Sequence, residues 1–395
     1  MSKLASLLVC SFLLFQGAGA QVLDSAQPRK VVPVAPVLEN TPLDSSVLES
    51  SITKGVDFLL RTQNSDGSWG NATRTKGLNI YAPMPGAHHA FRMGTTSLAL
   101  AGVIAANDKR SEVNAAIERC EAWMLREMPK LRRAEGSTIY NNWGHAYGLR
   151  ALVALAKREG VTEKKKAEYA KLAQTQLKSL WTNQDIDGGW GYYGFKSVTA
   201  KPSAGSNSFT SATVLLAIKE ASVFFKFKLD DRRIEKAVKS IQRQRTPDFA
   251  YTYATGHIKR PRYSINRPAG SLARTPACNA ALREWGDPKI TDEVLAMGLD
   301  RLIKRNGWLD IGRKRPKPHE THFAISGYFY YYGHYYASEN ILQLPDDQQG
   351  EWKSKLGKVI LDKQESDGSW WDYALYNYGH AYGTGYALTT LARCR

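Results

Sequence analysis

Residues 63–69 read QNSDGSW, and closely similar segments follow as QDIDGGW at 184–190 and QESDGSW at 364–370, with a degenerate copy, NGW, at 306–308. Each copy follows an amphipathic helical pattern and precedes a turn-rich stretch that leads into a helix of small, apolar residues. A segment that recurs along one chain is typical of repeat proteins, in which every unit adopts the same local fold. The spacing of these segments therefore decides the architecture.

Helical patterns extend the repeat beyond the clear copies. Ile52, Val56, Leu59 and Leu60 are spaced i, i+4, i+7 and i+8, which places them on one face of a helix. Comparable patterns end near residues 131, 184, 245, 306 and 364. The chain therefore contains six units of about sixty residues each.

The second helix of each unit differs in composition from the first. Residues 96–106, TSLALAGVIAA, are small or apolar on every side, as is typical of a helix that is buried all round. Its counterparts begin near Gly144, Phe209, Thr275, Thr321 and Gly379. The first helices carry charge on one face, as at residues 232–239. We therefore predict an all-α fold, an (α/α)6 toroid of six helical hairpins, with inner helices forming a ring inside an outer ring.

The Gln-to-Trp segment has a structural interpretation. Asp-Gly permits a tight turn after the outer helix, because glycine adopts backbone angles that other residues resist. The glutamine can hydrogen-bond backbone groups that the helix end leaves without partners, and the tryptophan can pack over the turn and join adjacent units. We therefore predict a structural role for Gln63, Trp69, Gln184, Trp190, Gln364 and Trp370.

The first fifty residues lack the repeat. Residues 1–20 combine Lys3, an apolar run and a small-residue AGA site, which is typical of a secretory signal peptide. Residues 21–50 contain four prolines and no sustained period, which predicts a linker or an extended arm before a toroid at 51–395. We therefore expect an exported protein, periplasmic or extracellular, with no transmembrane helix in the mature chain.

The formal net charge of +17 favours an anionic partner. Much of the excess lies in two basic stretches, at residues 257–262 and 313–319, and neither belongs to a specific nucleic-acid-binding module. Solvated basic loops are the simpler interpretation of these stretches. After the signal peptide, the cysteines are Cys120, Cys278 and Cys394, too few for disulfides to build the fold.

The Gln-to-Trp segments resemble the QW motifs of the terpenoid cyclase and protein prenyltransferase superfamily, which includes the squalene and oxidosqualene cyclases. Three good copies and three degraded ones cover residues 51–395. The resemblance implies the toroid fold and suggests a divergent, exported bacterial member. It implies much less about chemistry, because one fold serves many functions.

The acidic motifs of that superfamily are missing. The DxDD motif of class II cyclases would require aspartate at Lys228 or Leu344, before the two adjacent aspartate pairs of the chain. The magnesium-binding DDxxD motif would require aspartate at Ile234 or Gly350. If the protein is an enzyme, we expect a transferase or isomerase that works without a DxDD motif.

The zinc site of the prenyltransferases is present only in part. Cys278 follows a loop that resembles theirs, but Pro276 stands where the resemblance requires an aspartate. Glu320 takes the place of their histidine, with His319 and His322 beside it. A zinc ion held by Cys278 with His319, Glu320 or His322 is therefore a weak hypothesis, and no other cofactor is indicated.

A second repeated signature, GHAYG, occurs at residues 144–148 and 379–383. Aligning Gly327 with Gly385 places His145, His322 and His380 at equivalent positions at the starts of inner helices, with Thr95 in the same place in the first unit. We predict that these histidines are catalytic and surround one mouth of a central cavity, together with aromatic residues Trp143, Tyr147, Tyr328, Tyr378 and Tyr382. Alternatively, GHAYG is a helix-entry turn repeated because the units are homologous.

Three functions stay open on this sequence. The first is a terpene cyclase-like or prenyltransferase-like protein whose cavity binds an apolar or glycan-like small ligand. The second is a non-enzymatic scaffold of the cell envelope whose basic loops bind an anionic polymer. The third is a polysaccharide lyase or hydrolase on a similar barrel, which would need paired carboxylates or a Tyr/His/Arg set in the cavity.

Overall fold

The computed structural model of the protein describes residues 41–73, 75, 86–131, 140–192 and 205–395. The predicted signal peptide and residues 21–40 of the predicted arm lie outside these ranges. The first helix, α1 (Ser45–Thr62), begins before residue 51, so the last part of the expected arm belongs to the toroid. It starts there because the Asp44 side chain accepts hydrogen bonds from the backbone N–H groups of Ser46 and Val47.

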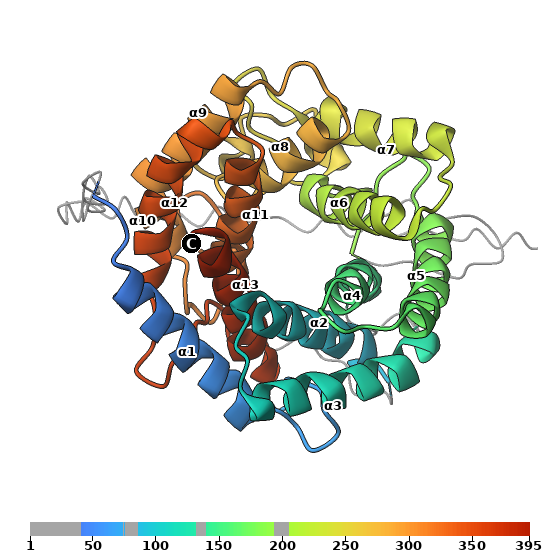
Figure 1. Ribbon diagram of the computed structural model, residues 1–395. Coiled ribbons are helices and arrows are strands. Elements are labelled where there is room, and N and C mark those ends of the chain that lie inside the picture. Colours follow the sequence, from blue (N-terminus) through green and yellow to red (C-terminus); the bar gives the residue numbers. More distant parts are fainter. Residues whose placement is uncertain (1–40, 74, 76–85, 132–139, 193–204) are drawn as a thin grey trace, which may run out of the picture. The chain divides into compact units, whose positions relative to one another are not determined.

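The described residues form helices arranged as two concentric rings (Figure 1). The outer ring consists of α1, α3 (Ser111–Glu127), α5 (Glu163–Asn183), α7 (Asp231–Gln244), α9 (Asp292–Lys304) and α12 (Asp346–Leu361). The inner ring consists of α2 (His89–Ala106), α4 (Asn141–Ala156), α6 (Ser208–Phe225), α8 (Arg274–Glu284), α11 (Tyr330–Leu342) and α13 (Gly379–Arg393). Short helices connect them: η1 (Met128–Lys130), η2 (Thr255–His257), η3 (Ser264–Asn266), α10 (Asn306–Asp310), η4 (Gly327–Phe329) and η5 (Tyr376–Tyr378).

The inner ring is closed. Each inner helix packs against the next in chain order, and α13 packs against α2. Side chains of the inner helices are buried on most sides, as their composition predicts. Among the described residues, α6 is long and apolar enough to cross a membrane by composition alone, but two thirds of it is buried in this ring, which accounts for that composition. The fold is therefore the predicted all-α toroid.

The tryptophans of the three Gln-to-Trp segments make the same contacts. Each indole N–H donates a 2.8 Å hydrogen bond to the carbonyl ten residues earlier, on Leu59, Leu180 or Ile360. Each tryptophan backbone N–H donates to a hydroxyl of the following inner helix, on Thr96, Ser211 or Thr384. The segment therefore joins the outer and inner helix of its own unit.

The glutamines of these segments join neighbouring units, but by a different contact from the one expected. Gln364 Nε2 donates to the Gly368 carbonyl at 3.0 Å and to the Ser51 carbonyl of α1 at 2.9 Å, which links the last unit to the first. Gln63 and Gln184 make the equivalent bonds to α3 and α7. The prediction that glutamine satisfies the end of its own helix was wrong, because its amide reaches the next outer helix instead.

The fifth unit departs from the prediction. Its inner helix was expected near Thr321, but α11 begins at Tyr330 after the short η4. Residues 311–326 form turns and loop, with backbone φ angles of 64° at Lys314, 61° at His319 and 54° at Ala324. Because these residues are not helical, His322 lies before the inner helix and is exposed.

Candidate functional site

A cavity of about 380 Å³ lies inside the inner ring. Its wall comes from five of the six inner helices or their N-terminal ends, and from the segments before α6, α8, α11 and α13. Most of the residues that line it are aromatic: Phe91, Tyr140, Trp143, Tyr147, Tyr192, Phe209, Tyr253, Tyr328, Phe329, Tyr332, Tyr373, Tyr382 and Tyr386. This volume falls in the range of about 300–1,000 Å³ typical of small-molecule pockets.

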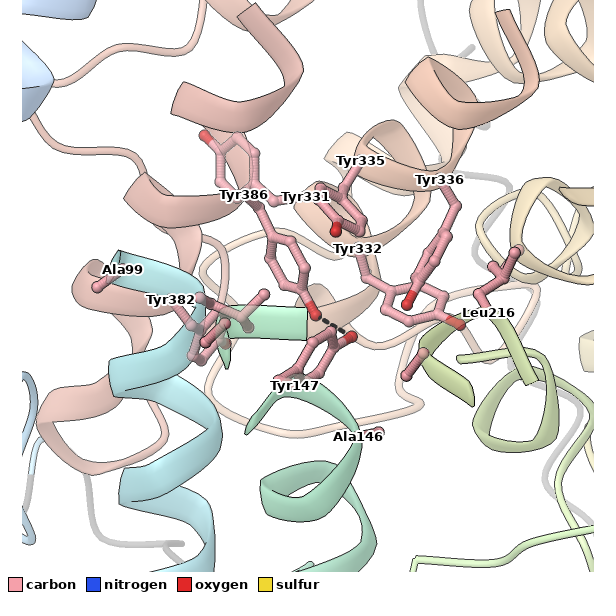
Figure 2. Packing of buried hydrophobic residues seen from close by; sticks show 14 of the residues in the cluster. Ala99, Ala146, Tyr147, Leu216, Tyr331, Tyr332, Tyr335, Tyr336, Tyr382 and Tyr386 are labelled. Atoms are coloured by element: carbon pink, nitrogen blue, oxygen red, sulfur yellow. Dashed lines mark hydrogen bonds between the residues drawn. The ribbon is translucent and has the colours of Figure 1, made fainter. Parts of the chain in front are cut away.

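Helical spacing explains why these rings meet. The pairs Trp143 and Tyr147, Tyr332 and Tyr336, and Tyr382 and Tyr386 are each four residues apart on an inner helix, so both members lie on one face. Figure 2 shows Tyr147, Tyr332, Tyr336 and Tyr386 converging from α4, α11 and α13, with a hydrogen bond between the hydroxyls of Tyr386 and Tyr147.

The same spacing directs the histidines away from the cavity. His145 is two residues after Trp143, and residues two apart on a helix do not share a face. The His145 ring is buried, and its Nδ1 lies 2.7 Å from Gln176 Oε1 on the outer helix α5. Burial lowers the pKa of His145 to about 4, so the ring is neutral at pH 7.

The expected meeting of His145, His322 and His380 does not occur. His380 is half-buried and stacks on Trp371 with ring centroids 4.8 Å apart, and His322 lies beside Trp308 at 6.0 Å. The three imidazoles therefore occupy separate surroundings, and none of them lines the central cavity. The alignment that made His322 equivalent to His145 was wrong.

The structural counterpart of His145 is His334, which occupies the fifth position of α11 as His145 does of α4. His334 Nδ1 lies 2.6 Å from the Tyr330 carbonyl, and Nε2 lies 2.7 Å from Asn306 Nδ2. Burial lowers the pKa of His334 to about 4. The contacts of His145 and His334 support the alternative interpretation of the GHAYG signature, in which its histidine is part of the helix packing.

Most of the residues predicted to line the cavity do so, unlike the histidines. Thr95, Trp143, Tyr147, Tyr328 and Tyr382 line the cavity. Tyr378 does not line it, and its hydroxyl lies 3.2 Å from His88 Nδ1. The sequence reading missed several wall residues whose positions depend on other units, among them Phe91, Tyr192, Phe209, Tyr253, Phe329 and Tyr332.

The candidate zinc ligands do not form a metal site. Cys278 is buried in α8, and burial raises the pKa of its thiol to about 12, whereas zinc binds the thiolate. His319, Glu320 and His322 lie in the loop before α11. Across the described residues, no three His, Cys, Asp or Glu side chains come together as a metal-binding group.

A buried carboxyl group stands behind one part of the wall. Asp372 is fully buried, its Oδ1 accepts a 2.9 Å hydrogen bond from the Tyr382 hydroxyl, and its Oδ2 accepts one of 3.1 Å from the Tyr331 backbone N–H. Burial raises the pKa of Asp372 to about 7, despite these donors. The carboxyl group is therefore partly protonated near neutral pH. The sequence signal was an aspartate two residues after Trp370, where the other clear copies have asparagine and tyrosine.

A chain of hydroxyls and an imidazole lines another part of the wall. The hydroxyls of Tyr192 and Tyr253 share a hydrogen bond, and Tyr253 also bonds Tyr328. The Tyr328 hydroxyl lies 3.2 Å from His319 Nε2, and His319 Nδ1 lies 2.6 Å from the Ala324 carbonyl. Because a carbonyl can only accept, Nδ1 carries the proton and Nε2 accepts from Tyr328. Partial desolvation lowers the pKa of His319, which favours this neutral form.

The fold and the cavity define the class of the protein, an α/α toroid whose closed ring of inner helices surrounds an aromatic cavity. No protein-family model matches the sequence, and no curated protein matches it. Solved structures with the same fold include two kinds of enzyme, and sequence identities of 14% or less limit the comparison to the fold.

The type II terpene cyclase MstE from Scytonema aligns with a TM-score of 0.53 and 14% identity, over 89% of this chain and 98% of the cyclase. The GH76A α-1,6-mannanase from Salegentibacter sp. HEL1_6 aligns with a TM-score of 0.53 and 11% identity, over 88% of this chain and 98% of the mannanase. The GH76 α-mannanase BT2949 from Bacteroides thetaiotaomicron aligns with a TM-score of 0.52 and 11% identity, over 88% and 95%.

Proposed function

We propose that the central cavity binds an apolar ligand of the isoprenoid class and transfers a proton to it, in a reaction of the terpene cyclase type. The observation that carries this proposal is the Asp372–Tyr382 pair beside a wall of aromatic rings. Aromatic faces bind apolar chains and stabilise positive charge. The shared fold with MstE, a type II terpene cyclase, is consistent with it.

The proton would move in two linked steps. With Asp372 protonated, its carboxyl group donates to the Tyr382 oxygen, which frees the Tyr382 hydroxyl hydrogen to face the cavity. Tyr382 then gives that hydrogen to a ligand double bond, and the Asp372 proton replaces it on the phenol. A C–H bond forms, the Asp372 carboxylate remains, and the positive charge on the ligand lies among the rings. Because Asp372 has a pKa of about 7, it can supply this proton near neutral pH.

A glycoside hydrolase is less well supported. Hydrolysis requires two carboxyl groups on either side of the bond to be cut, about 5–9.5 Å apart. Among the described residues, none that lines the cavity is an aspartate or glutamate. The Salegentibacter mannanase is inactive when two adjacent aspartates are replaced. The adjacent pairs of this chain lie exposed at the starts of the outer helices α7 and α12, at Asp230 and Asp231, and at Asp346 and Asp347.

A polysaccharide lyase is the second candidate, because Tyr253 and His319 line the cavity and Arg274 lies behind Tyr253. In such a reaction the ionised Tyr253 oxygen would remove a proton from the carbon beside the carboxylate of a uronic acid, the bond to the next sugar would break, and the leaving sugar oxygen would take up that proton. Incubation with alginate or polygalacturonate tests this candidate, since the unsaturated product absorbs ultraviolet light. A rise in absorbance that Tyr253→Phe abolishes would favour it over the isoprenoid proposal.

The scaffold hypothesis receives little support from the basic stretch at 313–319. Arg313 Nε lies 2.8 Å from Asp310 Oδ1, and Lys314 Nζ lies 2.7 Å from Glu365 Oε1. The Arg315 guanidinium is 3.8 Å from Glu320. Since neighbouring carboxylates already balance these cations, the stretch offers less free charge to a polymer than its sequence suggests.

Deuterium transfer from solvent tests the isoprenoid proposal. The purified protein would be incubated in deuterium oxide with squalene or geranylgeraniol, and extracted products analysed by mass spectrometry. We expect a product that carries one deuterium on carbon, and a loss of at least a hundredfold in its formation with Asp372→Asn or Tyr382→Phe. Asp310→Asn, which alters a carboxylate away from the cavity, is the matched control. Deuterated product formed equally by Asp372→Asn would refute the assignment of the acid.

A further inference from the structure

Arg274 is a buried cation without a carboxylate partner among the described residues. It is the first residue of α8 and is 1% exposed. Its Nη1 donates to the Gly270 carbonyl at 3.0 Å, and its Nη2 donates to the carbonyls of Tyr251 and Ile265. Its Nε is buried and has no hydrogen-bond partner within the described part of the chain. Neutral carbonyls accept hydrogen bonds from the two Nη groups of the guanidinium but leave its charge uncompensated.

Three arginines that are less deeply buried than Arg274 are each paired with a carboxylate. Arg150 contacts Glu220 at 2.9 Å and Glu339 at 2.5 Å, and Arg393 contacts Glu339 at 3.1 Å. Arg245 contacts Asp287 at 2.7 Å. An unpaired charge in the interior is strongly destabilising, and arginine does not avoid this penalty by losing its proton. The exception at Arg274 therefore calls for an anion from elsewhere.

The central cavity is where such an anion would lie. The Arg274 guanidinium packs on the rings of Tyr253 and Phe329, 5.5 and 5.7 Å from their centroids, and both rings line the cavity. The positive end of the α8 dipole adds to the potential on this side. The hydroxyls of Tyr192, Tyr253 and Tyr328 gather at the same part of the wall, and by turning from their present partners they can donate hydrogen bonds to an anion.

We propose that the ligand of the cavity carries an anionic group, a carboxylate or a phosphate, which binds at the Tyr192–Tyr253–Tyr328 hydroxyl cluster and is balanced by Arg274. This inference rests on the proposed function and narrows its substrate class to an apolar chain with an acidic head. The aromatic rings contact the chain, and the hydroxyls donate to the head. Arg274 acts through the field behind Tyr253 and is a positioning residue, since it does not line the cavity.

Calorimetric titration with matched probes tests the proposal on the full protein. Farnesol, farnesoic acid and farnesyl monophosphate share one chain and differ in the head group, while acetate and inorganic phosphate supply the head alone. We expect both acidic probes to bind about ten- to a hundredfold more tightly than farnesol, as a charge-assisted contact would provide. Acetate and inorganic phosphate should bind far more weakly than either.

Variants assign the preference to the wall. Arg274→Met should abolish the preference for farnesoic acid over farnesol, with the affinity for farnesol unchanged. Arg274→Lys should keep most of the preference. Tyr253→Phe should weaken farnesoic acid alone. Arg232→Met, which changes an exposed arginine of α7, is the control for the loss of one positive charge. Circular dichroism would verify folding, and Tyr253→Phe with the wild type decides the result if Arg274→Met does not fold.

The outcomes separate this proposal from the function on which it rests. If farnesol and farnesoic acid bind equally, the anionic head is refuted while the apolar cavity stands. If the preference for farnesoic acid persists in Arg274→Met, the assignment of Arg274 as the balancing charge is refuted. If acetate or inorganic phosphate binds as tightly as farnesoic acid, the site takes a free anion and the amphipathic class is refuted. If no farnesyl probe binds, the proposed function itself fails.

Discussion

At the scale of single residues, buried histidines make the protein sensitive to acid. His334 is neutral in the fold, with a pKa of about 4 against an ordinary value near 6.5. A depressed pKa means that the unfolded chain binds more protons between these values. The stability contributed by neutral His334 is therefore present above about pH 6.5 and is lost as the pH falls towards 4.

Replacing His334 tests this linkage. His334→Gln should be less stable than the wild type at pH 7, because it disturbs the contacts with Tyr330 and Asn306. The difference in unfolding free energy should shrink by roughly 3 kcal/mol between pH 6.5 and pH 4, since glutamine does not titrate. Urea unfolding at several pH values measures this difference. A gap that stays constant with pH would contradict a neutral, buried imidazole.

Asp372 makes the stability of the fold depend on pH in the opposite direction from His334. Its pKa of about 7 lies above that of an unfolded aspartate, so the folded protein binds more protons between about pH 4 and pH 7. The stability from the protonated carboxyl group is present below pH 4 and is lost as the pH rises through 7. As the pH rises from 4 to 7, the unfolding free energy of Asp372→Asn should therefore increase by up to roughly 4 kcal/mol relative to that of the wild type. The same urea titrations measure this change. A parallel pH profile for both proteins would indicate an ordinary carboxylate.

At the scale of elements, the turn of each Gln-to-Trp segment fits against the next outer helix. Gly368 has a φ of 90°, and a Cβ atom there would lie 2.4 Å from the Lys54 carbonyl oxygen of α1. Gly368→Ala should therefore destabilise the protein by at least about 3 kcal/mol, through backbone strain and the clash. Gly350→Ala is the control, because this exposed glycine lies inside α12 with no atom near the added carbon. Alanine there should be neutral or stabilising by up to about 1 kcal/mol.

The elements also show why the sequence predicted the rings better than the site. The Gln-to-Trp segments repeat the same hydrogen bonds to nearby residues, so one copy is informative about the others. The GHAYG histidines were placed at the right helix ends but on the wrong face, because each lies two residues from an inward aromatic side chain. Asp372 and Arg274 were not predicted as site residues, for another reason. Their surroundings come from Tyr331, Tyr382 and the loop at Ile265, which no local pattern connects to them.

At the scale of the whole molecule, charged groups connect four inner helices, including α4 and α11, which are not neighbours in the ring. Glu339 of α11 accepts hydrogen bonds from Arg150 of α4 at 2.5 Å and from Arg393 of α13 at 3.1 Å. Arg150 also donates to Glu220 of α6, and the Tyr335 ring lies under both guanidinium groups. Four of the inner helices are therefore held together by one network in their C-terminal halves.

Removing the shared carboxylate should weaken the whole ring. Glu339→Gln leaves two guanidinium groups short of negative charge in a largely buried place, and we expect a loss of about 3–5 kcal/mol in unfolding free energy. Adding Arg150→Met to this variant should recover part of that loss, since one stranded charge is then gone. Urea unfolding followed by both circular dichroism and tryptophan fluorescence would show one cooperative transition shifted as a unit. Glu351→Gln, which breaks an exposed pair with Lys355, should cost less than about 1 kcal/mol. A Glu339→Gln variant as stable as this control would mean that inner-helix packing alone holds the ring together.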